Sequence, residues 1–98
     1  MPDIDDADGT PIDLSFGEPL TGNMGPNAWT VVILPDSAAL LGTSKPVKVV
    51  GTIDAHEFRA TLLPLGEGRH MLPVNAKLRK VVGKVEGDAV SVHLSRRF

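Results

Sequence analysis

Apolar and polar residues alternate along several short stretches of the chain. Ile12, Leu14 and Phe16 are separated by polar residues, which is typical of a strand with one buried face. Residues 29–34, Trp-Thr-Val-Val-Ile-Leu, are dense in β-branched side chains and predict another strand. Similar runs cover residues 47–53, 58–63, 70–72 and 89–94. The pattern predicts a mainly β protein.

Two short helices are predicted between the strands. Each follows a Leu-Pro pair, starts after a residue whose side chain can cap a helix, and stops at a glycine. The first covers residues 38–41, with Asp36 or Ser37 as the cap and Gly42 as the stop. The second covers residues 76–82, with Asn75 as the cap and Gly83 as the stop.

Glycine, proline, asparagine and aspartate mark the predicted connections. Residues 18–27 contain several of them and predict a long loop. Residues 54–56 predict a hairpin turn. Two further turns are expected at residues 64–68 and 86–88.

The order of these elements occurs twice. In each half, a strand ending in Leu-Pro leads to a helix, a glycine, a polar loop and another strand. One such unit cannot bury its apolar face, but two can pair and close a small barrel without exposed edges. We therefore expect one β-barrel domain with two short helices over residues 11–98. An acidic, disordered tail is expected at residues 1–10.

Composition narrows the class of protein. The 98 residues are enough for one domain, and 42% hydrophobic with 22% charged residues is ordinary for a globular chain. The chain has no cysteine, which excludes disulfides, thiolate nucleophiles and cysteine-based metal sites. No leader-like or bilayer-spanning apolar stretch is visible, so we expect a cytoplasmic protein with no membrane partner.

The net charge of −2 is unevenly distributed. Residues 1–49 carry seven acidic and two basic groups, whereas residues 50–98 carry five acidic and eight basic groups. The second half is therefore the part that would receive an anionic partner.

Several short motifs occur in an order typical of a known family. They are Trp29-x-Val31-x-x-Leu34-Pro35, Gly51-Thr52-Ile53-Asp54, Leu63-Pro64-Leu65-Gly66, Lys77-Leu78-Arg79-Lys80, Gly83 and Gly87-Asp88-x-Val90. Over roughly residues 12–94 the chain resembles the bacterial domain-of-unknown-function family 1905. The resemblance implies a small double-split β-barrel. At positions 55 and 56 the chain has Ala-His, where the family normally has a glycine nearby.

The segment at residues 72–83, with the Gly-Asp pair that follows it, is also similar to swapped-hairpin transcription factors and antitoxins. Those proteins form a comparable barrel from two chains and often bind DNA. The resemblance implies that the internal repeat corresponds to a fused dimer. We therefore expect a monomer rather than a homodimer.

The candidate binding residues lie mostly on the second helix. Trp29, Arg79 and Lys80 combine one apolar and two cationic groups, and they predict a site for an anionic or planar small molecule, or for a protein. The alternative is a nucleic-acid interface formed by Lys77, Arg79, Lys80 and Lys84. The net negative charge and the 4% aromatic content disfavour nucleic acid as a partner.

Catalytic and metal sites are not predicted. His56, His70 and His93 lie on different elements, without the spacing of metal ligands. No serine lies beside a recognisable His/Asp pair, and no glycine-rich phosphate loop is found. We therefore expect a non-enzymatic binding module without a cofactor or a metal.

Overall fold

The computed structural model describes residues 9–24 and 29–98. Its strands are β1 (Thr10–Met24), β2 (Trp29–Leu34), β3 (Val47–Ile53), β4 (His56–Gly66), β5 (Arg69–Pro73) and β6 (Ala89–Arg97). The helices are α2 (Ser37–Leu41) and α3 (Ala76–Val82). The predicted mainly β class with two short helices is thus confirmed.

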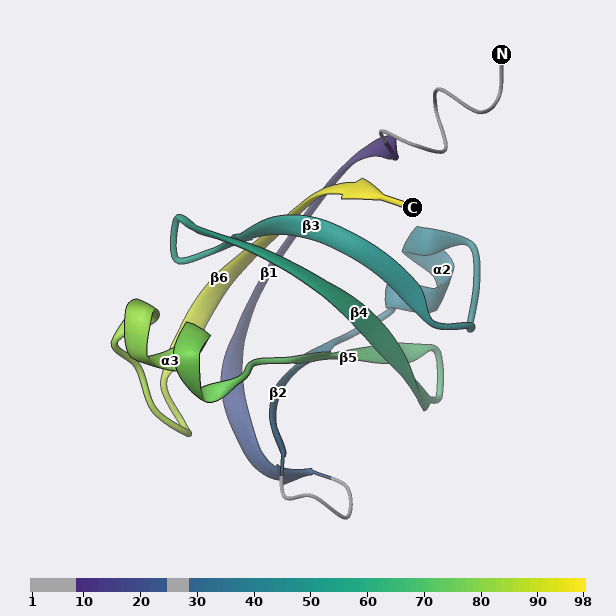
Figure 1. Ribbon diagram of the computed structural model, residues 1–98. Coiled ribbons are helices and arrows are strands. Elements are labelled where there is room, and N and C mark those ends of the chain that lie inside the picture. Colours follow the sequence, from purple (N-terminus) through teal and green to yellow (C-terminus); the bar gives the residue numbers. More distant parts are fainter. Residues whose placement is uncertain (1–8, 25–28) are drawn as a thin grey trace.

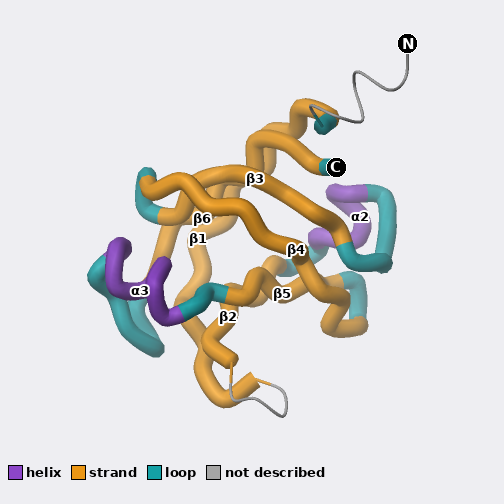
Figure 2. The backbone as a smooth tube through the Cα atoms, viewed as in Figure 1, coloured by secondary structure: helices purple, strands orange, loops and turns teal. Residues whose placement is uncertain are grey.

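The six strands form a closed barrel in the order β1-β2-β5-β4-β3-β6, with every neighbouring pair antiparallel. Figures 1 and 2 show the strands wrapped around one interior, with α2 and α3 on opposite sides of the barrel. In the described part of the chain, no helix has the length and apolarity needed to cross a membrane. The predicted closure of the sheet is confirmed, whereas the internal repeat stays a prediction.

Alternating side chains from every strand fill the barrel. Strand β3 shows the pattern most clearly, because Val47, Val49, Gly51 and Ile53 are buried while the residues between them are exposed or half-buried. Leu78 and Val82 of α3 pack against this core from outside the sheet. The buried apolar side chains are Phe16, Leu20, Val31, Val32, Leu34, Leu41, Val47, Val49, Ile53, Phe58, Leu62, Leu72, Val74, Val90, Val92 and Leu94.

Strand β1 is longer than the sequence indicates. The loop predicted at residues 18–27 is wrong for residues 18–24, because β1 continues to Met24. Residues 25–28 lie outside the described part. Pro19 is the last residue of β1 paired with β6, and Leu20 is the first paired with β2. Proline has no N–H to donate to a ladder, and here it lies where the strand exchanges one neighbour for another.

The ends of the chain also join the barrel. Thr10, which the sequence assigns to the tail, is the first residue of β1 and pairs with Arg97. Gly9, also assigned to the tail, is buried beside the start of β1, and residues 1–8 lie outside the described part. Strand β6 continues past its predicted end at residue 94, because its last residues pair with both β1 and β3.

The turn predicted at residues 64–68 is shorter than expected. Pro64 and Gly66 belong to β4, and only Glu67 and Gly68, both with positive φ, form the turn. The hairpin turn predicted at residues 54–56 is confirmed at Asp54 and Ala55, whereas His56 is the first residue of β4. The φ values of Asp54 and Ala55, 48° and 69°, are those of a two-residue type I′ turn, so the family's glycine is not required there.

The two helices begin differently. In α3 the prediction is confirmed, since Asn75 Oδ1 accepts a hydrogen bond from the Leu78 N–H at 2.8 Å. In α2 the predicted side-chain cap is wrong. Asp36 makes no capping hydrogen bond, and the hydroxyl of Ser37 faces Leu34 O and His70 Nδ1. The Ala38 N–H instead donates to the carbonyl of Gly68, in the turn between β4 and β5.

Candidate functional site

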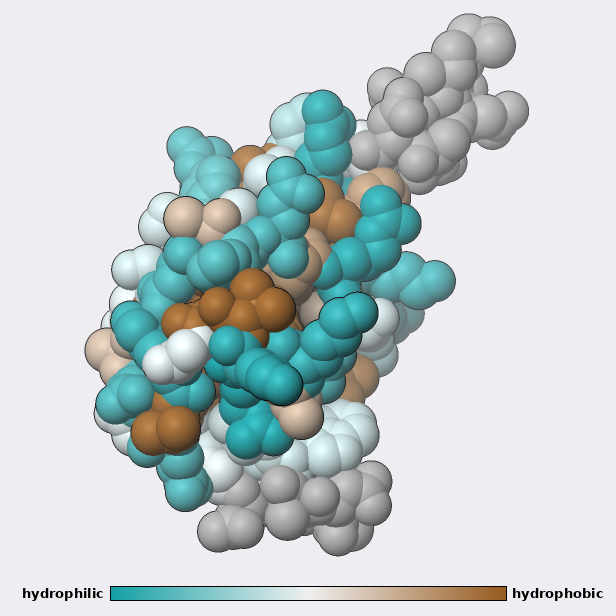
Figure 3. Space-filling model, turned by 60° about the vertical axis from the view of Figure 1, so that its left-hand side comes forward, coloured by the Kyte–Doolittle hydropathy of each residue, from teal (hydrophilic) through white to brown (hydrophobic). Residues whose placement is uncertain are grey.

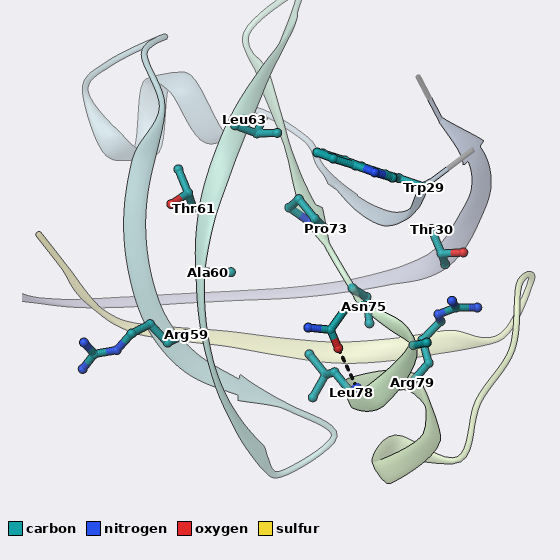
Figure 4. A pocket seen from close by; sticks show the side chains of 12 residues that line it. Trp29, Thr30, Arg59, Ala60, Thr61, Leu63, Pro73, Asn75, Leu78 and Arg79 are labelled. Carbon is teal, nitrogen blue, oxygen red and sulfur yellow. Dashed lines mark hydrogen bonds between the residues drawn. The ribbon is translucent and has the colours of Figure 1, made fainter. Parts of the chain in front are cut away.

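A groove of about 700 Å³ lies between β2, β4, β5 and the start of α3. Its apolar lining comes mainly from Trp29, Leu63, Pro73, Val74 and Leu78, and its polar lining from threonine, asparagine and arginine side chains. Figure 4 shows these side chains around the opening. Seen from the side that carries α3, the surface has an apolar patch ringed by hydrophilic side chains (Figure 3).

Backbone pairing holds the two sides of the groove together. Val31 pairs with Pro73 where β2 meets β5, and the Val74 N–H donates to Thr30 O at 2.9 Å. The start of β2 is therefore fixed to the segment that leads into α3. The Asn75 cap then fixes the first turn of α3, from which Leu78 and Arg79 reach the groove.

Trp29 is the first residue of β2 and keeps 40% of its surface exposed. An indole that is neither in the core nor fully in water offers a flat apolar face with a polar N–H. Trp29 therefore lies on the rim of the groove, where it is available for stacking.

Arg79 is half-buried, and its Nε atom is enclosed without a hydrogen-bond partner. Leaving a buried polar atom unsatisfied costs about 1–3 kcal/mol, and more for a charged group. The chain keeps this cation at the groove without supplying a counter-charge from the described residues.

A second arginine, Arg59 of β4, lies at the other end of the groove (Figure 4). It is exposed, and its guanidinium carbon lies 5.5 Å from the centroid of the Phe98 ring. Among the described lining residues, Arg59 and Arg79 are the ionisable ones, so the groove is cationic.

The sequence model of one family matches residues 16–94 of the chain, described as a domain of unknown function, DUF1905. The chain belongs to this family. The matched region extends from Phe16 in β1 to Leu94 in β6, and it includes every residue that lines the groove. Among curated proteins, none matches the chain.

In this DUF1905 barrel the three predicted ligand-binding residues are not all together. Trp29 and Arg79 line the same groove, whereas Lys80 is exposed on α3 and does not. Neighbouring residues of a helix point in directions about 100° apart, so Arg79 and Lys80 cannot share one narrow site. The residues that sequence patterns missed are Arg59 and Leu63, which β4 brings to the groove from a distant part of the chain.

The four residues predicted to form a nucleic-acid interface do not lie on one surface either. Lys77 and Lys80 are exposed, Arg79 lines the groove, and Lys84 belongs to an internal ion pair. Lys84 Nζ lies 2.7 Å from Asp54 Oδ2 and donates to Ala89 O at 2.8 Å. A lysine held in this way is not free for phosphate, and the nucleic-acid alternative has no support.

Asp54 is the acidic partner in that ion pair. Its Oδ1 accepts the Ser91 N–H at 2.8 Å. The hydrogen bond from Lys84, followed by that from Ser91, holds the pKa of Asp54 below its ordinary value of 3.8. The cluster fastens the β3–β4 turn to β6 and to the segment after α3.

The three histidines lie apart. His70 is fully buried between Ser37 Oγ and Lys45 O, both 2.9 Å from its ring nitrogens. His93 Nε2 lies 2.7 Å from Asp13 Oδ1 on the surface, and His56 is exposed at the β3–β4 turn. Within residues 9–24 and 29–98, no three histidine, aspartate or glutamate residues form a group suited to a metal.

Proposed function

We propose that this DUF1905 barrel binds a small organic molecule in the groove and performs no chemistry on it. The observation that carries the proposal is the presence, at one groove, of a half-exposed indole and a half-buried guanidinium that has no partner among the described residues. Its volume of about 700 Å³ lies within the range of small-molecule sites, which are mostly apolar with a few polar groups.

The chemistry of the lining supports binding rather than catalysis. The ionisable groups among its described residues are arginines, and a guanidinium group is a poor general acid or base. General acid–base catalysis needs a group whose pKa lies near the working pH. The lining instead supplies a fixed positive charge and an apolar surface.

Trp29 would supply much of the binding energy. Covering the remaining exposed surface of one indole is worth about 2 kcal/mol at roughly 25 cal/mol per Å². The size of the groove favours a small molecule over a protein, because twelve described residues line it and a standard protein interface uses about 20–30 residues on each side.

The test is a ligand screen read by thermal shift and by tryptophan fluorescence. Trp29 is the one tryptophan of the chain, which has no tyrosine, so the fluorescence reports the groove directly. A compound that binds the native state raises the unfolding temperature with its concentration. We expect hits to change Trp29 emission and to lose most of their thermal shift in Trp29→Ala.

The matched control is Leu40→Ala, which removes a large exposed apolar side chain from α2 on the opposite side of the barrel. This variant should keep the thermal shifts of the wild type. Hits that stabilise Trp29→Ala as much as the wild type, or a broad screen without hits, would contradict the proposal.

A further inference from the structure

We propose that the ligand is an organic acid, with a flat apolar body against Trp29 and a carboxylate paired with Arg79. This inference rests on the proposed function, which it deepens by assigning the chemical class of the ligand and separate roles to the two residues.

The charge of the groove is the first argument. Its described lining contains two arginines and no aspartate or glutamate, although the whole chain has a net charge of −2. A concave site with one sign of charge raises the local concentration of ligands of the opposite sign. The groove therefore favours anions over cations and neutral molecules.

The state of Arg79 is the second argument. Four Lys or Arg side chains in the described part are half-buried, and they are Arg69, Arg79, Lys84 and Arg97. Three of them have protein partners: Arg69 faces Glu67 at 3.6 Å, Lys84 pairs with Asp54, and Arg97 donates to Leu41 O. Arg79 has none among the described residues, and its enclosed Nε is already removed from water. An anion from outside the chain would supply the missing counter-charge.

Geometry assigns the carboxylate to Arg79 rather than to Arg59. Arg59 is exposed and already lies against the Phe98 ring, and in Figure 4 its guanidinium points away from the middle of the groove. Arg79 is half-buried with its Nε enclosed, so less side-chain freedom is lost when it binds. Because Nε is enclosed, a carboxylate would form a forked pair with the two terminal Nη groups. The ligand would then supply the counter-charge of the guanidinium, while Nε itself would keep no hydrogen-bond partner among the described residues.

The apolar residues that line the rest of the groove indicate the chemistry of the uncharged part of the ligand. Trp29, Pro73 and Leu78 present the apolar surface of the groove. In Figure 4, Leu78 lies between the two arginines, and Pro73 and then Trp29 lie progressively farther from them. An aromatic ring can stack on the indole at low entropic cost, and such pairs bind more tightly than the area that they cover accounts for. An acid with a ring one short chain away from its carboxylate suits this arrangement.

The experiment compares hydrocinnamate with its neutral counterpart, hydrocinnamamide, by calorimetry and Trp29 fluorescence on the full chain. The two compounds differ in charge and share their apolar body. We expect the acid to bind roughly ten- to a hundred-fold more tightly, the usual effect of a hydrogen-bonded charge. Arg79→Gln should remove this preference while leaving the weak binding of the amide, and Arg79→Lys should restore part of it.

Arg69→Gln is the matched control, because it makes the same change in net charge at a half-buried arginine outside the groove. It should leave the affinity for the acid within about two-fold. Arg69 begins β5 and Pro73 of the groove ends it, roughly 13 Å apart at about 3.3 Å per residue, which exceeds the screening length at ordinary salt. An unfolding midpoint measured for each variant separates lost binding from lost structure.

Three results would overturn the inference. They are equal affinity for acid and amide, an equal loss of acid binding in Arg69→Gln and Arg79→Gln, and an unchanged preference for the acid in Arg79→Gln. If neutral compounds bind at Trp29 and acids bind no better, the inference fails while the proposed function stands. If neither compound binds, the inference fails, and the broad thermal-shift screen decides the proposed function separately.

Discussion

Gly51 lies where β3 passes β6 at a shift of register, and no side chain fits there. A Cβ atom at this position would lie 1.9 Å from the carbonyl oxygen of His93. Because that oxygen belongs to the backbone of the neighbouring strand, it can move only if the barrel distorts. The absence of a side chain at Gly51 therefore allows β3 and β6 to approach each other this closely.

We therefore expect Gly51→Ala to destabilise the fold by about 3 kcal/mol or more, at or above the upper end of ordinary overpacking. Chemical denaturation followed by circular dichroism measures this change. Gly17→Ala is the matched control in β1, where a Cβ would meet nothing within 4 Å. It should be neutral or slightly stabilising. A fully stable Gly51→Ala variant would show that the strands separate more easily than the structure indicates.

At the scale of elements, the barrel is held at its turns by side chains from neighbouring segments. Asp54 and Ala55 adopt positive φ without a glycine, which is strained for an alanine. Asp54 then bonds Ser91 of β6 and Lys84 after α3. The hairpin that joins β3 and β4 is thus fastened to two elements that follow it in the chain.

The lowered pKa of Asp54 predicts how stability depends on pH. A carboxyl with a lower pKa in the folded than in the unfolded state stabilises fully above its ordinary value. That contribution disappears as the pH falls through the folded value. We expect the wild type to lose stability below about pH 4 more steeply than Asp54→Asn, which is less stable at neutral pH and lacks this contribution.

Unfolding midpoints measured from neutral to acidic pH test this prediction. Asp36→Asn is the control, since Asp36 also has positive φ but makes no side-chain capping bond. Its acid slope should equal that of the wild type. Parallel slopes for all three proteins would show that the Asp54–Lys84 pair does not contribute to acid sensitivity.

The whole molecule depends on pairing between distant segments. β6, the last strand, lies between β1, the first, and β3, so the barrel closes only when both ends of the chain are in place. The two short helices depend less on distant pairing than the strands do. Each helix is fixed mainly at its ends, and α3 has no fully buried residue. A monomer rather than a homodimer stays a prediction, as does a cytoplasmic location.

This arrangement predicts the pattern of native-state hydrogen exchange. The hydrogen-bonded amides of Val92 and Leu94 in β6 should exchange only through global unfolding, because freeing them opens the barrel. The amides of α3 should exchange faster, through local opening. Exchange followed by NMR at increasing denaturant distinguishes the two classes. Equal protection of α3 and β6 would mean that the helix and the barrel unfold as one unit.

The sequence by itself determined the features that depend on a few neighbouring residues. The strand at Trp29–Leu34 and the helix at Ala76–Val82 were predicted with their observed bounds. In both cases the signal is local: a run of β-branched residues in the strand, and a cap and a glycine stop at the ends of the helix.

Tertiary structure decided the features that depend on residues distant in the sequence. It extended β1 through Pro19, because a second neighbouring strand takes over at Leu20. It also separated two cations that look equivalent in sequence. Lys84 pairs with Asp54, thirty residues earlier, whereas Arg79 faces the groove and has no acidic partner among the described residues. Whether a charged side chain has a partner depends on which opposite charge the fold brings within a few ångströms of it. The periodicity of residues along the chain carries no information about that distance.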